Sequence, residues 1–495
     1  MSSLESRRIE LQNKLDSMKT IESRREFGQF STPTQLAKEI LDYAIKHLNK
    51  PVSFLDPAFG MGSFYSALIN TGAIIEEAKA YEIDPHYCGP SSEFWREYPI
   101  KIENKDFIQE LPSYKCNLLI CNPPYVRHHL IEPEYKKKMQ SMIKKELGIE
   151  ISGLSGLYCY YLMLCHKWLE PGALSAWLVP SEFMDVGYGS ALKTYLLTNV
   201  KLIRIHRFDP ENVQFDDALV SSAVVWFTNE MPSDTDEIVF SFGGTHDNPV
   251  NLRSISRSTL KMEKKWTRFP MKDERKAGSY TPLSHYFKAK RGLATGCNEF
   301  FIMNRATAIE RGIPDIYLTP ILPSPRQMKV NHIHEDKDGF PKEVEQLVLL
   351  TCNDDIETVK LQSESTYCYI QSGRENVSKT YLCSKRKTWY QQELRAPAPI
   401  VCSYMGRGDS NPFRFILNES KAVTTNSYLM LYPTNQFIEE FGDSKDVMYK
   451  VWTYLNSISA SLLDEGRVYG GGLQKIEPKE LMNVNVDGLS SYLSK

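Results

Sequence analysis

Short apolar segments alternate with amphipathic ones through the first half of the chain. The apolar segments have the length of strands and occur at residues 52–55, 118–121, 176–180 and 220–227. Such segments are typical of parallel strands buried on both faces, and the spacing between them is typical of helices that cover a sheet. From about residue 52 to residue 228, this alternation predicts one doubly wound α/β domain.

The first 25 residues are rich in charge, yet their apolar side chains recur at near-helical spacing. These side chains are Leu4, Ile9, Leu11, Leu15, Met18 and Ile21. The spacing predicts an amphipathic helix over residues 1–25, which we expect to cover a core without a catalytic role. Another helix should begin near Ser31-Thr32-Pro33, because a hydroxyl residue suits the N-cap and proline suits the first turn.

The apolar run at 118–121 stops abruptly at Asn122-Pro123-Pro124-Tyr125. Two prolines cannot continue a sheet, so a rigid loop leaves the carboxyl end of a strand, where open α/β sheets bind ligands. Asn122 offers a side-chain carbonyl and Pro123 a main-chain carbonyl, and two acceptors suit an amino group. Tyr125 offers a flat face for a planar base. By itself, the motif is equally compatible with an ordinary turn.

Residues suited to a nucleotide follow the earlier strands of the same domain. The segment 56–62 is a glycine-bearing turn between a strand and a helix, although the GxGxxG fingerprint is absent. Glu82 ends the next strand, where an acidic residue can bind ribose hydroxyls. Asp106-Phe107 ends the third element. Each acid alone is typical of a solvated loop, but acids at successive strand ends favour a single site.

The character of the sequence changes from about residue 251, where the helix–strand alternation ends and basic residues become frequent. We therefore divide the chain into an N-terminal helix (1–25), a first domain (26–250) and a second, α+β domain (251–495). A length of 495 residues with 42% hydrophobic content allows two or three packed domains.

The composition indicates which features this protein should lack. The ten cysteines form no CxxC pair and no Cys/His cluster at zinc spacing, so we expect reduced thiols and no metal. With no signal peptide and no long apolar span, we expect a soluble cytoplasmic protein, and a monomer is the simplest assembly. A formal charge of −2 neither favours nor excludes a nucleic-acid partner.

Taken in order, these motifs resemble the gamma-class N6-adenine DNA methyltransferases of type II restriction–modification systems. They are Ser31-Thr32-Pro33, the 56–62 turn, Glu82-Ile83-Asp84, Asp106-Phe107 and Asn122-Pro123-Pro124-Tyr125. The resemblance covers the first half of the chain and continues more faintly at 292–298 and 471–476. It implies a Rossmann-like, seven-stranded mixed sheet that binds S-adenosylmethionine, followed by a C-terminal α+β target recognition domain that binds double-stranded DNA.

The resemblance also implies a role for each matching residue. The cofactor would be bound by Thr32, Asp56, Ala58, Gly60, Glu82, Ile83, Asp106 and Phe107. The target amino group would be held by Asn122 and Pro123, and the extruded base would stack on Tyr125 and Phe215. Basic side chains of the second domain are candidates for DNA contacts, although each is also typical of a plain surface charge. They are Lys288, Lys290, Arg291, Arg326 and Arg407.

Three alternatives stay open at this stage. The same Asn-Pro-Pro-Tyr pocket also serves RNA and protein-glutamine methyltransferases, but the large second domain favours DNA. The chain could instead be the methyltransferase part of a larger restriction or defence complex, or a DNA-binding protein with a degenerate fold. Because no nuclease module is recognisable ahead of Phe27, we expect a modification enzyme, with any cognate endonuclease acting separately.

Overall fold

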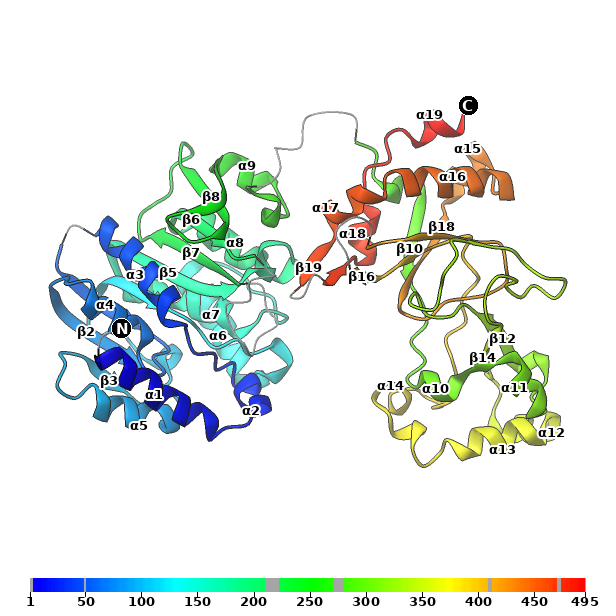
Figure 1. The fold of residues 1–495 in the computed structure, drawn as a ribbon, viewed down its shortest axis with the longest axis horizontal. Coiled ribbons are helices and arrows are strands. Elements are labelled where there is room, and N and C mark those ends of the chain that lie inside the picture. Colours follow the sequence, from blue (N-terminus) through cyan, green and yellow to red (C-terminus); the bar gives the residue numbers. More distant parts are fainter. Residues whose placement is uncertain are drawn as a thin grey trace. The chain divides into compact units, whose positions relative to one another are not determined.

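The chain forms two compact units in the computed structural model, Met1–Lys276 and Ala277–Lys495 (Figure 1). The structure describes residues 3–48, 50–209, 222–270, 280–407, 412–469 and 473–494. Within these ranges, no helix is both long enough and apolar enough to cross a membrane.

Unit 1 is built on a mixed sheet with nine described strands, in the order β3-β2-β1-β4-β5-β7-β6-β8-β9. Their bounds are β1 Val52–Asp56, β2 Ile75–Tyr81, β3 Lys101–Glu103, β4 Cys116–Cys121, β5 Leu169–Pro180, β6 Lys201–Arg207, β7 Ser222–Thr228, β8 Glu237–Gly244 and β9 Pro249–Ser256. Strands β1 to β5 are parallel where they pair, whereas β7 runs antiparallel to both of its neighbours. The prediction of seven strands is corrected to nine, because a β8–β9 hairpin extends the sheet beside β6.

The predicted domain boundary at residue 250 falls inside this hairpin. Strand β9 and the helix after it, α9 (Arg257–Met262), lie in unit 1, whereas the sequence analysis assigned them to the second domain. Strand β9 is an edge strand with mostly exposed or half-buried positions, so it carries no apolar run that would identify it.

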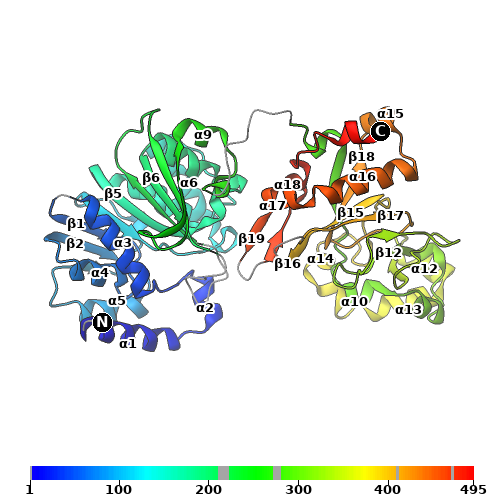
Figure 2. The same cartoon turned by 45° about the horizontal axis from the view of Figure 1, so that its top comes forward.

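Helices cover both faces of the sheet (Figures 1 and 2). One face is covered by α3 (Thr34–His47) and α4 (Ser63–Asn70). The other is covered by α6 (Pro133–Leu147), α7 (Leu157–Leu164) and α8 (Ser190–Thr198). The remaining helices of unit 1 are α1 (Ser3–Ser17), α2 (Ile21–Glu26) and α5 (Pro85–Phe94).

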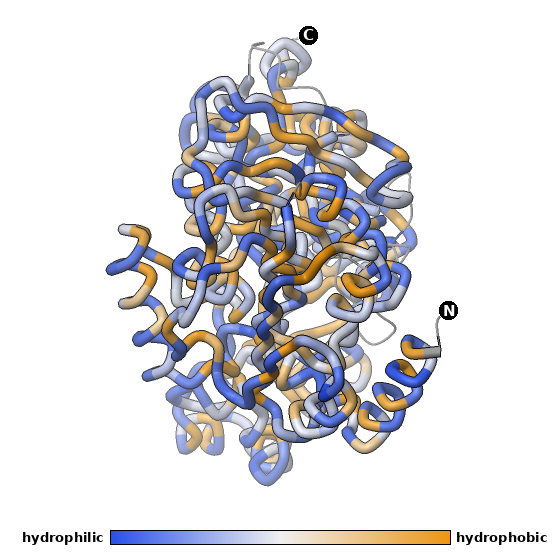
Figure 3. Tube along the Cα trace, turned by 90° about the vertical axis from the view of Figure 1, so that its left-hand side faces the viewer, coloured by the Kyte–Doolittle hydropathy of each residue, from blue (hydrophilic) through white to orange (hydrophobic). Residues whose placement is uncertain are grey.

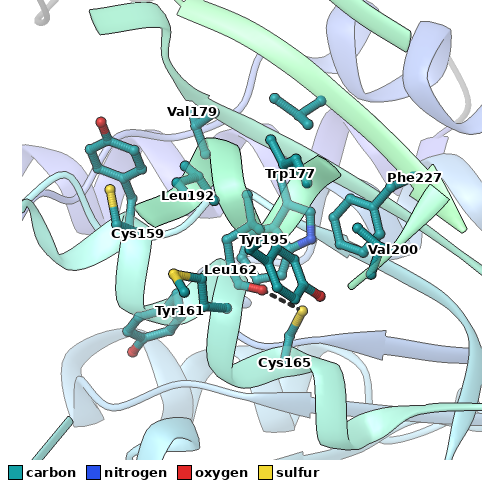
Figure 4. Close-up of a cluster of buried hydrophobic side chains, with 14 of the residues drawn as sticks. Cys159, Tyr161, Leu162, Cys165, Trp177, Val179, Leu192, Tyr195, Val200 and Phe227 are labelled. Carbon is teal, nitrogen blue, oxygen red and sulfur yellow. Dashed lines mark hydrogen bonds between the residues drawn. The ribbon is translucent and has the colours of Figure 1, made fainter. Parts of the chain in front are cut away.

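The central strands are buried on both sides, which explains their continuous apolar sequence. Along β4, Leu118 and Ile120 pack into the core beneath α3 and α4, while Leu119 and Cys121 pack into the core beneath α6 to α8. Successive side chains of a strand point to opposite faces, so both sets must be apolar. Figure 4 shows part of the second core, where Trp177, Tyr195 and Phe227 gather.

The N-terminal segment folds as two helices instead of one. The break falls at residues 18–20, where the Thr20 hydroxyl accepts a hydrogen bond from Ser23 N and caps α2. The buried stripe of α1 is mostly polar and comprises Glu5, Arg8, Gln12 and Leu15. Figure 3 shows the mixture of hydrophilic and hydrophobic residues along this helix, beside the N label.

An ion pair explains how charged side chains can be buried there. Arg8 Nη2 lies 2.8 Å from Glu5 Oε1, and the Glu5 carboxylate also accepts hydrogen bonds from Thr34 and Ser66. A buried charge is tolerated when it is paired and hydrogen-bonded in this way. The apolar spacing predicted the helix, but polar contacts hold it in addition to the apolar ones of Leu11 and Leu15.

Unit 2 is an α+β arrangement of small sheets and short helices. A five-stranded sheet has the order β10 (Phe287–Arg291), β18 (Tyr428–Pro433), β15 (Ile400–Ser403), β17 (Phe415–Asn418) and β13 (His332–Ile333). Two three-stranded sheets comprise β11 (Ile302–Asn304), β14 (Leu347–Leu350) and β12 (Leu318–Ile321), and β16 (Met405–Arg407), β20 (Leu473–Lys475) and β19 (Arg467–Tyr469). The helices are α10 (Asn298–Phe301), α11 (Arg305–Glu310), α12 (Ile356–Gln362), α13 (Glu364–Ser372), α14 (Tyr381–Ser384), α15 (Asn435–Phe441), α16 (Lys445–Ser457), α17 (Leu462–Glu465), α18 (Pro478–Met482) and α19 (Leu489–Leu493).

Candidate active site

A cavity of about 360 Å³ lies in unit 1, where β1, β2 and β4 end. It brings together residues from all three strand ends and from the segment before α3. Among the predicted site residues, those that line it are Thr32, Asp56, Ala58, Gly60, Glu82, Ile83 and Asn122. Parallel strands put their carboxyl ends at one edge of the sheet, so the sequence motifs converge there.

Two carboxylates organise the floor of this cavity. Asp56 Oδ1 accepts a hydrogen bond from Ala58 N at 3.1 Å and closes the turn after β1. Glu82 Oε2 accepts from Gly60 N at 2.8 Å, and Glu82 Oε1 accepts from Asp84 N at 2.8 Å. The Glu82 side chain therefore ties the turn after β1 to the turn after β2.

Burial disfavours the charged forms of both carboxyl groups. It raises the pKa of Asp56 to about 8, and the nearby Glu82 adds to the rise. Burial also raises the pKa of Glu82, against the opposing effect of its two main-chain hydrogen bonds. Two carboxyl groups in one cavity with raised pKa values are typical of a binding or catalytic site.

The N-terminal segment forms one wall of the cavity. Gln12, Phe27, Gln29 and Phe30 line it, although residues 1–25 were expected to have no catalytic role and only Thr32 was predicted to bind cofactor in the segment that follows. Asp84, at the start of α5, accepts hydrogen bonds from both Lys19 and Gln29. These contacts fasten the segment that joins α1 to α3 against the carboxyl end of β2.

Asn122 lines the cavity and contacts the segment before α3. Its Nδ2 donates to Phe30 O at 2.8 Å and to Thr32 Oγ1 at 3.1 Å. Because a main-chain carbonyl can only accept, these contacts fix which end of the amide is the amine. Asn122 Oδ1 is buried and accepts no hydrogen bond from the described residues. The amide thus offers a fixed acceptor at the edge of the cavity.

The role of Thr32 differs from the predicted helix cap. Pro33 is the N-cap of α3, which begins at Thr34, and it makes no side-chain capping bond. The Thr32 hydroxyl is used instead to hold the Asn122 amide. The predicted apolar face of the helix is present, with Leu36, Ile40 and Leu41 buried.

A close contact between main chains holds the Asn-Pro-Pro-Tyr loop. Tyr125 N donates to Gly28 O at 3.1 Å. Gly28 has a φ of +64°, and a Cβ placed on it would lie 2.3 Å from Tyr125 N. Only glycine fits this position, to which the sequence pattern assigned no role. The sequence feature that could have indicated this close contact is the glycine itself, which stands between Phe27 and Gln29 just before a predicted helix.

Tyr125 is anchored through its side chain. Its hydroxyl donates to Leu178 O at 3.0 Å, and its ring centroid is 5.6 Å from that of Phe30. Neither Tyr125 nor Pro123 is among the described residues that line the cavity, whereas Pro124 is. The aromatic ring is therefore held by its hydroxyl end.

Asp106 and Phe107 are placed differently from the other predicted cofactor residues, and neither is found among the described lining residues. The Asp106 carboxylate caps a short helical turn through Ile108 N and accepts from Tyr135 Oη at 2.6 Å. The Phe107 ring is buried against Trp168, at a centroid distance of 5.1 Å. Phe215, the predicted second aromatic at the target base, lies outside the described residues.

Two families of known proteins match parts of this chain. The family described as "Eco57I restriction-modification methylase" matches residues 79–214, which include the Asn-Pro-Pro-Tyr loop. The family described as "Type II methyltransferase M.Eco57I, C-terminal domain" matches residues 263–494. Over these two ranges, the chain is similar to the Eco57I-like type II restriction–modification methyltransferases.

Two relatives resemble this chain along most of their length. The type II methyltransferase M.AccI of Acinetobacter calcoaceticus is 29% identical over 93% of this chain and 85% of its own. The type II methyltransferase M.XamI of Xanthomonas campestris pv. amaranthicola is 25% identical over 94% of this chain and 86% of its own.

A solved structure shares the fold. The type IIL restriction-modification enzyme MmeI, in complex with DNA, aligns with a TM-score of 0.53 and 13% identity. The alignment covers 90% of this chain but 64% of MmeI, so this methyltransferase spans less than two thirds of that protein.

The predicted DNA contacts of the methyltransferase lie in unit 2. Lys288 and Lys290 are exposed and share one face of β10, an edge strand. Arg291 stacks on Tyr404, with its guanidinium 4.0 Å from the ring centroid, and Lys475 lies 5.1 Å from the same ring. Arg407 is exposed on β16, and Arg326 is exposed in a turn after β12. Arg291 and Lys475 therefore share the Tyr404 ring, beside Glu477, which pairs with Lys475.

Replacing Gly28 with alanine should destabilise unit 1 and displace the Asn-Pro-Pro-Tyr loop. The matched control is Gly72→Ala, because Gly72 also has a positive φ, of +74°, but no atom lies within 4 Å of its added Cβ. Backbone strain alone should cost Gly72→Ala about 1 kcal/mol. Gly28→Ala should lose clearly more stability in denaturant unfolding, and equal losses would mean that the contact with Tyr125 does not constrain the loop.

Replacing Asp56 with asparagine should change how stability depends on pH. Folded Asp56 keeps its proton up to about pH 8, whereas the unfolded carboxyl loses it near its ordinary value of about 3.9. Raising the pH through this window therefore favours unfolding, by at most about 1.4 kcal/mol per pH unit.

The Asp56→Asn variant lacks this group, so its stability relative to the wild type should grow as the pH rises towards 8 and then level off. The measurement is the thermal unfolding midpoint of both proteins at several pH values. Asp42→Asn on the outer face of α3 serves as the control. Parallel pH profiles for Asp56→Asn and the wild type would contradict the assignment.

Proposed function

We propose that this chain is a site-specific DNA adenine methyltransferase. It transfers the methyl group of S-adenosylmethionine to N6 of an adenine that has been flipped out of duplex DNA. The names of the relatives and families favour a role in a restriction–modification system, where methylation protects host DNA. RNA and protein-glutamine acceptors remain the alternatives that the experiment below discriminates.

The observation that carries this proposal is the state of Asn122. Its side-chain oxygen is buried, faces no donor in the described chain, and belongs to a residue that lines the cavity. A buried acceptor without a partner costs roughly 1–3 kcal/mol, so it is retained where a ligand supplies the missing donor. An amino group of a substrate supplies such a donor.

The residues around the cavity fit S-adenosylmethionine. The cofactor supplies a methyl group on a sulfonium centre, ready for direct displacement. Glu82 still has acceptor capacity for the ribose hydroxyls beyond its two main-chain hydrogen bonds. Ile83 is 59% exposed although it is apolar, which suits a side chain that packs against an adenine ring. Thr32 lies beside Asn122, at the end where the methyl group would arrive.

Asn122 and Pro123 would activate the target nitrogen by accepting its two hydrogen bonds. The lone pair of an aromatic amino group is delocalised into the ring, so this nitrogen is a poor nucleophile. Two fixed acceptors draw the nitrogen toward tetrahedral geometry and stabilise the positive charge that develops during transfer. The nitrogen–carbon bond forms as the carbon–sulfur bond breaks, and the extra proton then leaves to water.

The same geometry requires the target base to leave the double helix. An amino group paired inside a duplex cannot reach a buried acceptor, so the nucleotide must be extruded. Stacking on Tyr125 would repay roughly 1–3 kcal/mol of the unstacking cost. The Tyr125 hydroxyl is already bonded to Leu178 O, so the ring and not the hydroxyl is the part available to a base. Unit 2 would carry sequence readout, with Lys288, Lys290, Arg291, Arg326 and Arg407 as candidate contacts.

The direct test uses purified protein, labelled S-adenosylmethionine and unmethylated duplex DNA. The digested nucleosides should contain N6-methyladenine, and sequencing should map it to one short motif. Label on RNA or on protein would instead support the alternative acceptors. Cofactor binding without transfer to any of these polymers would point to a partner subunit in a larger complex.

Replacing Asn122 with alanine should abolish methyl transfer while cofactor binding largely survives. By analogy with the loss of one stabilising hydrogen bond in other enzymes, the rate should fall by roughly 100-fold or more. The measurement is single-turnover transfer, beside equilibrium binding of S-adenosylmethionine.

The matched control is Thr32→Val, which removes one partner of the Asn122 amine but leaves the Asn122 oxygen in place. It should lose much less activity than Asn122→Ala. Wild-type rates for Asn122→Ala would overturn the proposed chemistry.

A further inference from the structure

Three residues of unit 2 converge at the edge of its five-stranded sheet. His332 and His334 lie two positions apart at β13, and Glu419 directly follows β17. The two strands pair in parallel, with His332 opposite Leu417 and Ile333 opposite Asn418, and Glu419 N donates to Ile333 O at 2.9 Å. This register puts Glu419 beside His334.

The three side chains are close enough to share one ion. One nitrogen from each imidazole and one oxygen of the Glu419 carboxylate all lie within 4.8 Å of one another. His332 Nε2 lies 3.5 Å from Glu419 Oε1, and the two imidazole centroids are 4.0 Å apart. Neighbouring ligands of a tetrahedral zinc ion are separated by about 3.4 Å, given metal–ligand bonds of about 2.0–2.1 Å.

A fourth residue orients one of the imidazoles. His334 Nδ1 lies 2.6 Å from Glu343 Oε1, while Glu343 Oε2 accepts a hydrogen bond from His334 N at 2.9 Å. A carboxylate that holds Nδ1–H leaves Nε2 with its lone pair exposed, which is the usual arrangement around a metal-binding histidine.

His332 supplies a second, independent observation. Its Nε2 is buried and makes no hydrogen bond within the described part of the chain. At 3.5 Å, with no hydrogen bond formed, Glu419 does not satisfy it. A buried ring nitrogen without a partner needs an explanation, and a bound ion supplies one.

Charge around the cluster favours a cation. The Glu343 and Glu419 carboxylates adjoin the two imidazoles. The nearby cation, Lys445, is paired with Glu335 at 3.0 Å, although its charge also interacts with that of Glu419. Two carboxylates therefore lie against the imidazoles, while Lys445 already has a partner of its own.

We propose that His332, His334 and Glu419 form a site for a divalent transition metal, with Zn²⁺ as the best match. Two imidazoles and one carboxylate suit zinc, whereas calcium and magnesium favour all-oxygen sets. The bound ion ties β13 to the turn after β17, with water completing its coordination. It acts as a brace within unit 2, separate from the methyltransferase cavity of unit 1.

The sequence did not reveal this site, because its ligands are far apart along the chain. The expectation of no metal rested on the lack of clustered Cys and His at zinc spacing. Here two ligands come from a His-x-His pair at β13, and the third directly follows β17, which is distant in sequence but pairs with β13 in the fold.

The test is calorimetric titration of the full-length, chelator-treated protein with ZnCl₂. We expect one tight site per chain that raises the thermal unfolding midpoint. Titration with CoCl₂ should give visible bands typical of nitrogen and oxygen ligands, without a thiolate-to-cobalt band. The absence of a thiolate-to-cobalt band distinguishes binding at this cluster from adventitious binding at any of the ten cysteines.

Zinc binding by substituted proteins tests which residues form the site. His334→Ala and Glu419→Gln should each weaken zinc binding by at least about 100-fold, and Glu343→Gln by about 10–100-fold. His285→Ala, elsewhere in unit 2, should bind zinc as the wild type does, and circular dichroism checks that each variant is folded. No zinc binding by the wild type, or full binding by His334→Ala and Glu419→Gln, would overturn the proposal.

Discussion

The candidate active site depends on one contact between distant parts of the chain. The segment before α3 reaches across the end of β4, where Gly28 O accepts from Tyr125 N and Phe30 O accepts from Asn122 Nδ2. These two main-chain acceptors orient the amide and hold the double-proline loop. Since the prolines keep the loop rigid, fixing both of its ends leaves Asn122 Oδ1 a single direction to face. Without that segment, the loop would end a strand but would not define a site.

A second constraint comes from the carboxylates beneath the loop. Asp56 and Glu82 are kept in an apolar setting in which their charged forms are disfavoured, and main-chain N–H groups partly compensate Glu82. Groups held in this way gain from hydrogen-bond donors that a ligand brings. The floor of the cavity therefore favours a ligand that is rich in hydroxyl groups. Without a ligand, the free energy of its two carboxyl groups is higher.

The sequence predicted the structure best where a strand is buried on both of its faces. The apolar run of β4 and the acidic residue after β2 located the strand ends and hence most of the cavity. Polar contacts were hidden from such patterns, since Thr32 looks like a helix cap and the buried face of α1 carries Glu5 and Arg8. The β9 strand escaped notice because an exposed edge strand has no apolar signature. Asp106 and Phe107 matched a motif, yet their side chains are engaged in a turn and in the core.

The distribution of cavity residues along the chain has an evolutionary consequence. The described residues that line it lie between Gln12 and Tyr161, whereas the division between the two units falls after Lys276. Genetic exchange at that junction would therefore transfer a whole unit 2 without replacing any of these lining residues. If unit 2 reads DNA, new specificities could arise by shuffling of gene segments while the chemistry is inherited unchanged.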